Sequence, residues 1–283
     1  MFIFKKTADL KAFLKKNNAS IHPIGFVPTM GALHEGHLSL IRMSKSSNSL
    51  SICSIFINPT PFNQAADLQR YPRTPSNDIA LLAKVGCDVL FLPEVSEIYP
   101  PGLDTTVKID LNGLDNIMEG EFRPGHFAGV LQVVKRLLDI IEPNNLYLGQ
   151  KDFQQFSIIQ HMIRELSLPV NLVIAPIIRE PNGLAKSSRN ERLSPKQKEQ
   201  ASVIYEALLE SKAQMDSHDI PGIKMKALRN LSIPGFKPEY FEIVDGSTLL
   251  PVKHKDDADW IVACTAVWAG EVRLIDNIVL KEK

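Results

Sequence analysis

Short apolar runs alternate with helical patterns over the first two thirds of this chain. Each run is bounded by proline, asparagine or glycine and is too short for a helix: Ile24–Val27, Leu50–Ile57, Val89–Leu92, Leu146–Leu148 and Leu172–Ala175. Such runs predict strands buried on both faces, and the intervening helices favour parallel pairing. We therefore expect an α/β fold, a parallel sheet with helices on both faces. Ligands of such sheets bind outside the carboxyl ends of the strands.

The pattern changes near Pro176. Residues 179–192 are rich in polar residues, glycine and serine. Two helical patterns and then three strand patterns follow, at 195–214, 222–231, 240–244, 260–268 and 273–276. Gly270, between the last two strand patterns, predicts a hairpin. We therefore expect two domains, residues 1–178 and a small α+β C-terminal lid domain of residues 179–283.

Two further elements are expected in the first domain. Apolar and polar residues alternate over Thr105–Leu114, which favours an edge strand. A helical pattern covers Ser76–Val85, with Ser76 placed to cap its start and Gly86 placed to end it.

The stretch Pro28–His37 follows the first apolar run and has the residues of a phosphate site. Gly31 and Gly36 bracket His34 and His37, which are three positions apart and share a face if a helix begins there. Backbone N–H groups at a helix start favour an anion. The alternative is a tight turn with two surface histidines. We favour phosphate contacts that stabilise charge on a pentacoordinate phosphorus.

Two other segments have weaker patterns of the same kind. Lys151 stands where a predicted strand gives way to a helix, and Gln155 lies one turn further on. In Lys186–Asn190, two hydroxyls stand beside an arginine, whose fork suits phosphate oxygens. Taken alone, that segment is a solvated loop, but Gly183 and its place between the predicted domains favour a mobile lid.

A fourth group, Glu119, Arg123 and His126, precedes a predicted helix. Its arginine either pairs with a nucleotide or holds a structural carboxylate, and the residues alone leave both open. Other phosphate and nucleophile motifs are missing, since the sequence has neither a Walker loop nor a Gly-x-Ser-x-Gly turn.

Composition narrows the function classes. The 283 residues carry 32 Lys and Arg against 32 Asp and Glu, so bulk charge gives no argument for nucleic acid or an anionic membrane as a partner. Three scattered cysteines, Cys53, Cys87 and Cys264, form no Cys-x-x-Cys pair, which argues for reduced thiols and against structural zinc. With no apolar signal-like segment at Met1–Lys6, we expect a cytoplasmic protein.

Several long motifs, in order, resemble the pantoate–β-alanine ligase (pantothenate synthetase) family over nearly the full length. They are Pro-Thr-Met-Gly-Ala-Leu-His-Glu-Gly-His at 28–37, Ser-Ile-Phe-Ile-Asn-Pro at 54–59, Arg-Tyr-Pro-Arg-Thr at 70–74, Glu-Gly-Glu-Phe-Arg-Pro-Gly-His-Phe at 119–127, Gly-Gln-Lys-Asp-Phe-Gln-Gln at 149–155, Ser-Ser-Arg-Asn at 187–190 and Arg-Leu-Ile-Asp-Asn at 273–277.

The resemblance implies a Rossmann-like ATP domain, similar to the His-x-Gly-His nucleotidyl transferases, and a homodimer. It implies an AMP-forming ligase that makes pantothenate from pantoate, β-alanine and ATP with Mg²⁺. Pantoyl adenylate and pyrophosphate form first, and β-alanine then displaces AMP. A carboxylate acylates an amine only after its oxygen becomes part of a good leaving group.

The resemblance also assigns residues. His37 would be the proton donor, and His34, Lys151 and Arg189 would complete the catalytic set. ATP would contact residues 30–37 (the signature turn), residues 149–152, Ile178 and residues 186–189 (the serine-rich loop). These residues are Met30, Gly31, Ala32, Leu33, His34, Glu35, Gly36, His37, Gly149, Gln150, Lys151, Asp152, Ile178, Lys186, Ser187, Ser188 and Arg189. Asn58, position 61 and Gln155 would bind substrate, and metal ligands are not assigned.

Two positions depart from the family pattern. Pro61 stands where a glutamine usually contacts pantoate and β-alanine, and proline offers no side-chain amide or backbone N–H. Loss of that bond would cost roughly 1–3 kcal/mol of substrate binding. Asn63 or a water would substitute for it. Lys186 replaces an apolar residue and either contacts phosphate or faces solvent.

Two rival functions remain at this stage. A nucleotidyl transferase would stop at the nucleotidylated product and would lack acyl and amine pockets around Asn58 and Gln155. A catalytically weak nucleotide-binding module is favoured only by Pro61 and disfavoured by the intact His34 and His37.

Overall fold

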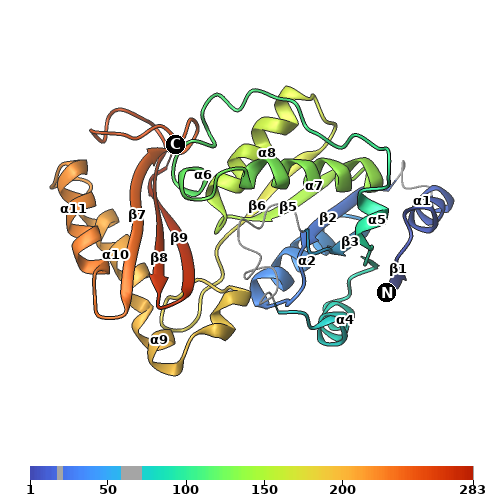
Figure 1. The fold of residues 1–283 in the computed structure, drawn as a ribbon, viewed down its shortest axis with the longest axis horizontal. Coiled ribbons are helices and arrows are strands. Elements are labelled where there is room, and N and C mark those ends of the chain that lie inside the picture. Colours follow the sequence, from blue (N-terminus) through green and yellow to red (C-terminus); the bar gives the residue numbers. More distant parts are fainter. Residues whose placement is uncertain (18–21, 59–71, 283) are drawn as a thin grey trace. The chain divides into compact units, whose positions relative to one another are not determined.

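Six parallel strands form one of two sheets in the described part of the chain (Figure 1). The computed structural model describes residues 1–17, 22–58 and 72–282. The strand order is β1-β4-β3-β2-β5-β6, with bounds Phe2–Phe4 (β1), Ile24–Thr29 (β2), Leu50–Ile55 (β3), Val89–Phe91 (β4), Asn145–Gly149 (β5) and Asn171–Ala175 (β6). The predicted α/β class is therefore confirmed. The three-residue strand β1 was not predicted.

Strands β2 and β5 are neighbours, although the chain between them visits β3 and β4 on one side before returning. The strand order therefore reverses between β2 and β5, which is the topological switch point of this sheet. The signature turn follows β2, and Gly149 ends β5. Two of the motifs singled out in the sequence thus follow neighbouring strands.

Helices cover both faces of this sheet. Figure 1 shows α7 and α8 on one side and α2 and α4 on the other. Val27, Cys53, Leu90 and Tyr147 form a buried apolar cluster with Leu40 and Ile41 of α2 and Leu82 of α4. The helices of this part of the chain are Thr7–Lys16 (α1), Glu35–Ser47 (α2), Pro75–Lys84 (α4), Val95–Ile98 (α5), His126–Ile141 (α7) and Phe153–Glu165 (α8).

The C-terminal part contains an antiparallel sheet in the order β7-β8-β9. Helices α10 and α11 pack together on it and share an apolar core with its strands. The predicted hairpin at Gly270 is present, since Ala269 of β8 pairs with Val272 of β9. The elements of this part are Ser188–Arg192 (η1, a 3₁₀ helix), Pro195–Gln200 (α9), Ser202–Gln214 (α10), Ile220–Leu231 (α11), Phe236–Asp245 (β7), Ile261–Ala269 (β8) and Val272–Lys281 (β9). The short helix Glu119–Phe122 (α6) lies earlier in the chain, between α5 and α7.

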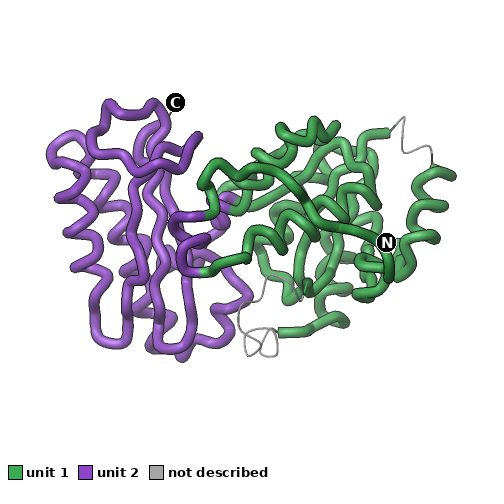
Figure 2. The backbone as a smooth tube through the Cα atoms, turned by 45° about the horizontal axis from the view of Figure 1, so that its top comes forward, with its two compact units in different colours: residues 1–115, 123–149, 155–176 green, residues 116–122, 150–154, 177–283 purple. Residues whose placement is uncertain are grey.

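The chain divides into two compact units, coloured separately in Figure 2. The first comprises residues 1–115, 123–149 and 155–176, and the second comprises 116–122, 150–154 and 177–283. Two short segments therefore pack with the second unit although both of their flanking stretches belong to the first. The predicted functional boundary at 178/179 stays a prediction.

The expected edge strand at Thr105–Leu114 is wrong. The segment has no strand structure, although alternate side chains are half-buried. Gln132 of α7 donates to the Thr105 hydroxyl (2.7 Å), and the His161 ring of α8 hydrogen-bonds to the Asp110 carbonyl (2.7 Å). The alternation therefore reflects an extended segment that packs against helices, without a partner strand.

Two helix boundaries also differ from the predictions. Thr74, not Ser76, is the N-cap of α4, because Pro75 occupies the first helical position, where a missing N–H costs nothing. The single helix predicted over 195–214 is divided into α9 and α10 by a turn at Ala201. Helical spacing continues through that turn, so the apolar pattern does not mark it.

In the described ranges, no helix combines the length and apolar character that crossing a membrane requires.

Candidate functional site

The signature turn after β2 requires backbone conformations that glycine adopts most easily. Gly31 has φ of 82° and Ala32 has φ of 48°, so two successive residues are left-handed before α2 begins at Glu35. A Cβ on Gly31 would lie 3.1 Å from an Asp78 carboxylate oxygen. Gly31 therefore permits both the turn and the close approach of this carboxylate.

The Asp78 carboxylate binds the backbone of the signature turn. Its buried carboxylate accepts the N–H of Ala32 (3.0 Å) and of Leu33 (2.8 Å), and the Thr74 hydroxyl donates to it as well (3.2 Å). These two N–H groups precede the N-cap of α2, so they are not the helix-start N–H groups that the sequence assigned to an anion, and that assignment stays a prediction. Leu33 is also buried, in the apolar cluster on the α2 side of the sheet.

The two histidines cap helix α2. His34 is the N-cap, and its Nδ1 accepts the Gly36 N–H (3.2 Å), while Nδ1 of His37 accepts the His34 N–H (3.3 Å). The rings lie side by side, with centroids 4.0 Å apart. Because each Nδ1 accepts an N–H, the neutral ring carries its hydrogen on Nε2, which makes Nε2 the donor atom.

Other predicted positions in the first unit have differing surroundings. Met30 is half-buried, and Glu35 is exposed and paired with Arg42 of the same helix. Asn58 is buried; its amide donates to the Gly129 carbonyl (3.1 Å), and its carbonyl oxygen accepts the Tyr99 hydroxyl (3.2 Å). Gln155 is half-buried in the first turn of α8.

Position 61 lies outside the described residues, as do residues 70 and 71 of the Arg-Tyr-Pro-Arg-Thr motif.

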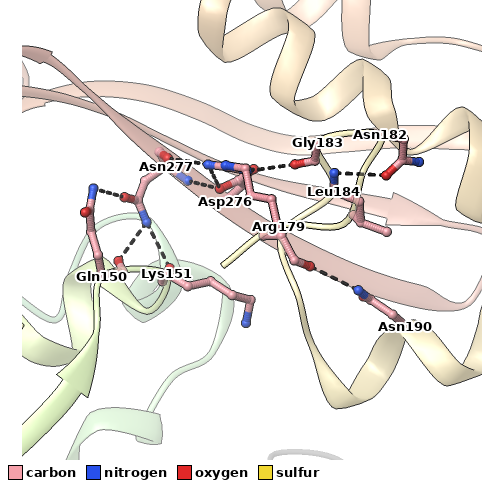
Figure 3. A network of polar contacts seen from close by, with 10 residues as sticks. Gln150, Lys151, Arg179, Asn182, Gly183, Leu184, Asn190, Asp276 and Asn277 are labelled. Carbon is pink, nitrogen blue, oxygen red and sulfur yellow. Dashed lines mark hydrogen bonds and ion pairs between the residues drawn. The ribbon is translucent and has the colours of Figure 1, made fainter. Parts of the chain in front are cut away.

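In the second unit, Gln150–Asp152 forms the turn between β5 and α8, and Asn277 of β9 binds its backbone. The Asn277 amide donates to the carbonyls of Gln150 and Lys151, at 2.9 Å each, and its oxygen accepts from the Gln150 side chain (3.2 Å). Lys151 has its ammonium 3.8 Å from the Asp152 carboxylate. Figure 3 shows this amide beside the lysine turn.

Residues 178–186 form a small hairpin. The backbone N–H of Lys186 donates to the Ile178 carbonyl (2.9 Å), and the backbone N–H of Glu180 donates to the Leu184 carbonyl (2.8 Å). The Lys186 ammonium lies 3.0 Å from the Glu180 carboxylate across this hairpin. The sequence had left two environments open for Lys186, phosphate or solvent. The structure shows a third, a cross-strand ion pair.

Arg179 anchors the hairpin to β9. Its guanidinium makes two hydrogen bonds to the buried Asp276 carboxylate (2.6 and 3.0 Å) and donates to the Gly183 carbonyl (3.0 Å) (Figure 3). It also lies 3.8 Å from the centre of the Tyr205 ring. Burial raises the pKa of the Asp276 carboxyl, and the Arg179 guanidinium opposes that rise. The pair therefore compensates a charge that burial alone would disfavour.

The serine-rich loop after the hairpin forms the 3₁₀ helix η1. The Ser187 hydroxyl accepts the Arg189 N–H (3.3 Å), so it caps this helix. The Asn190 amide donates to the Ala185 carbonyl (3.0 Å), which ties η1 to the hairpin. Ser188 is buried, whereas Arg189 is half-buried.

Glu119 is a structural carboxylate. Its arginine partner is Arg273 of β9, whereas the sequence had suggested Arg123 as an arginine that could hold a carboxylate. Arg273 makes two hydrogen bonds to Glu119 (2.7 and 2.8 Å) and also pairs with Glu239, and the Tyr240 hydroxyl donates to Glu119 (2.8 Å). Burial, and then the Glu119 charge, raise the pKa of Tyr240 well above its ordinary value. The role of Arg123 stays open.

Comparison with known proteins decides the family. The family model described as pantoate-beta-alanine ligase matches residues 2–279. The pantothenate synthetase of Azobacteroides pseudotrichonymphae is 46% identical over 281 residues, covering 98% of this chain and 99% of that one. The chain belongs to the pantoate–β-alanine ligase family. The protein is a ligase that makes pantothenate from pantoate, β-alanine and ATP, as the motifs predicted.

Solved structures of this ligase family have the same fold. Pantothenate synthetase from Thermus thermophilus superposes with a TM-score of 0.93 at 38% identity and covers 99% of this chain and 100% of its own. The pantoate–β-alanine ligase from Francisella tularensis, solved with Beta-gamma ATP and β-alanine, is also 38% identical, with a TM-score of 0.81 and coverage of 99% and 98%.

The predicted site residues of the ligase divide between the two units. The first unit holds Met30–His37, Asn58, Gly149 and Gln155, and the second holds Gln150–Asp152, Ile178 and Lys186–Arg189.

Four residues that support these segments had no role assigned from the sequence: Asp78, Arg179, Asp276 and Asn277. The last two belong to the Arg-Leu-Ile-Asp-Asn motif, which was a signal that the residue patterns alone could not convert into a role. Asp78 stands in the first turn of a helix, where an acidic residue is ordinary.

Proposed function

We propose that this ligase works in two steps through pantoyl adenylate. In the first, an oxygen of the pantoate carboxylate attacks the α-phosphorus of ATP, a P–O bond forms, and pyrophosphate leaves with the electrons of the broken P–O bond. In the second, the amine of β-alanine attacks the acyl carbon, the C–O bond to AMP breaks, and the amine loses a proton. The products are pantothenate and AMP.

The observation that carries this proposal is the hydrogen bonding of the histidine pair. Because Nδ1 of both rings is bound to backbone N–H groups of α2, we assign phosphate contact to the Nε2–H groups of His34 and His37. Such donors stabilise charge that develops on phosphate oxygens. We assign neither ring as a base toward pantoate, because a carboxylic acid is already ionised at neutral pH.

The charge on the departing pyrophosphate is assigned to the second unit. Lys151 brings an ammonium to the turn after β5, and Arg189 brings a guanidinium to η1, beside Ser187 and Ser188. A guanidinium and two hydroxyls match the oxygens of a pyrophosphate. Lys186 is assigned to the hairpin, because its ammonium is already paired with Glu180.

Pantoate binding is assigned to Asn58 and Gln155, with Pro61 as a modulator. Asn58 has both ends of its amide hydrogen-bonded within the first unit, which orients it rigidly. Pro61 weakens substrate affinity without changing the reaction. Pro61→Gln should lower the KM values of pantoate and β-alanine about ten- to a hundredfold. Unchanged values for both substrates would show that this position is not in the pocket.

We propose that Mg²⁺ enters with ATP. The described residues contain no group of three His, Cys, Asp or Glu side chains placed to hold a metal ion. Mg²⁺ is commonly held by substrate phosphates and water with only one or two protein carboxylates, so we assign most of its ligands to the triphosphate and water. When bound, Mg²⁺ would neutralise phosphate charge.

A homodimer and a cytoplasmic location belong to the same proposal. The location agrees with the three cysteines, which are free and buried. Size-exclusion chromatography with light scattering would test the dimer.

The experiment that tests the two-step reaction follows each half separately. Exchange of labelled pyrophosphate into ATP is measured with and without pantoate, and AMP release is measured with and without β-alanine. We expect exchange to require pantoate and AMP release to require β-alanine. Exchange without any response to β-alanine would favour a nucleotidyl transferase. Absence of exchange at high pantoate concentration would favour a nucleotide-binding module.

A further inference from the structure

Asn277 uses its whole carboxamide to hold the two residues at the lysine turn. The side chain is 1% exposed; its two N–H groups reach the carbonyls of Gln150 and Lys151, and its oxygen accepts from the Gln150 amide (Figure 3). The partners determine the orientation of the amide, because the reversed orientation would face an oxygen toward two carbonyls. Aspartate has the same shape but cannot donate these bonds.

Asp276, the preceding residue on the same strand, holds the hairpin of residues 178–186 through Arg179. Asp276 is 4% exposed, and its carboxylate binds Arg179, whose guanidinium also donates to the Gly183 carbonyl at the turn of the hairpin. Gly183 has φ of 92°, and a Cβ there would lie 2.6 Å from the Tyr205 ring. The hairpin is therefore fixed at its turn as well as at its base, and it leads directly to Ser187.

Two adjacent residues of β9 thus bind the backbone segments that carry Lys151 and, through the hairpin, Arg189. Their hydrogen bonds go to two backbone carbonyls and to a neighbouring arginine, and the Asp276 carboxylate also attracts the Lys151 ammonium electrostatically. A strand of a packed sheet is more rigid than a loop, so side chains that depend on it keep their positions better.

We propose that Asn277 and Asp276 are positioning residues for the pyrophosphate-forming step. Asn277 sets the position of Lys151, and Asp276 sets the position of Arg189 through Arg179 and the hairpin. This inference rests on the proposed contacts of Lys151 and Arg189 with the departing pyrophosphate. Only the first half-reaction contains pyrophosphate, so a loss of positioning should slow adenylate formation and spare the attack by β-alanine.

The test begins with Asn277→Asp, which preserves size and removes both donors. We expect its pyrophosphate exchange to fall about ten- to a hundredfold, since small misplacements of a catalytic group have effects of that size. Single-turnover AMP release, started by adding β-alanine to enzyme that already holds the adenylate, should change less than about threefold. Asn277→Ala, which introduces no charge, serves where the aspartate variant does not fold.

The matched control is Thr265→Val. Thr265 lies on β8 opposite Asp276 and is fully buried, and its hydroxyl also donates to a backbone carbonyl, that of Tyr240 (2.7 Å). The Thr265→Val variant should lower the melting temperature about as much as the Asn277 variants do and leave pyrophosphate exchange unchanged. Equal loss in both half-reactions of an Asn277 variant, or an equal loss of exchange in the control, would overturn the inference.

A double-mutant cycle with Lys151→Ala separates this inference from the proposed function. Where Lys151→Ala slows exchange and Asn277→Asp adds less than about threefold in that background, Asn277 acts through Lys151. Full additivity of the two changes would refute positioning while leaving the role of Lys151 intact. Wild-type exchange in Lys151→Ala would instead refute the proposed role of the lysine, and the inference with it.

Discussion

Asp78→Asn is the sharpest single perturbation of the signature turn. The carboxylate accepts two backbone N–H groups, from Ala32 at 3.0 Å and Leu33 at 2.8 Å, in a buried environment. The two N–H groups bind different carboxylate oxygens, and asparagine has an oxygen at only one of these two positions, so its NH₂ group faces the other donor. One charge-assisted bond is lost and one buried donor is left unsatisfied, so the free energy of unfolding should fall by about 2–4 kcal/mol.

The same substitution should also impair catalysis. The turn leads into the N-cap His34, so a shift of its backbone moves the histidine pair, and kcat/KM for ATP should fall about ten- to a hundredfold. Urea unfolding and steady-state AMP formation measure the two effects. Asp88→Asn is the matched control, because Asp88 accepts one backbone N–H, from Ser51 at 2.8 Å, outside the turn. It should lower stability and leave the KM of ATP unchanged.

Two results would refute this reasoning. An unfolding free energy within about 0.5 kcal/mol of wild type would mean that the turn does not depend on the Asp78 charge. A lower KM for ATP would mean that removing a negative charge near the turn outweighs the loss of its geometry.

Three other predictions concern groups away from the signature turn. Lys186→Met should change the KM of ATP less than about threefold and stability by about 0.2–1 kcal/mol, because its ion pair is partly exposed; steady-state kinetics and urea unfolding check this. Arg273→Met should cost about 3–5 kcal/mol in urea unfolding, because the buried carboxylate of Glu119 and the half-buried carboxylate of Glu239 lose their cation; a cost below about 1 kcal/mol would contradict the prediction. Burial raises the pKa of the Cys87 thiol to about 11, so at pH 8 about one molecule in a thousand is thiolate; native thiols should resist iodoacetamide, with labelling rising toward higher pH and becoming complete in guanidinium.

Most elements of the parallel sheet could be predicted because each is a local property. The runs at Ile24–Val27 and Val89–Leu92 are apolar over their whole length and became β2 and β4 with shifts of one or two residues. Strand β1 could not be predicted in the same way, because it has only three residues and Phe2 is 59% exposed. Its strand structure depends on pairing with β4, which is distant in the sequence.

The candidate site shows the same division. The spacing of His34 and His37 placed both rings at the start of a helix, and this prediction is confirmed. The Thr105–Leu114 strand failed because alternation reports that one side of an extended segment is covered, and it does not report what covers it. For Lys186, charge and loop composition could not identify Glu180 as the partner, because that pair depends on the hairpin register.

The sequence by itself determined the local structure and the family. Strand and helix formation follow from apolar spacing over a few residues, and the order of long motifs identified the ligase. Only the tertiary structure decided which groups hold the motifs in place: Asp78 binds Ala32 from 46 positions away, and Asn277 binds Lys151 from 126 positions away. The physical reason is that a hydrogen bond between distant residues requires only that the folded chain bring one donor to one acceptor, and this leaves no periodic pattern in the sequence.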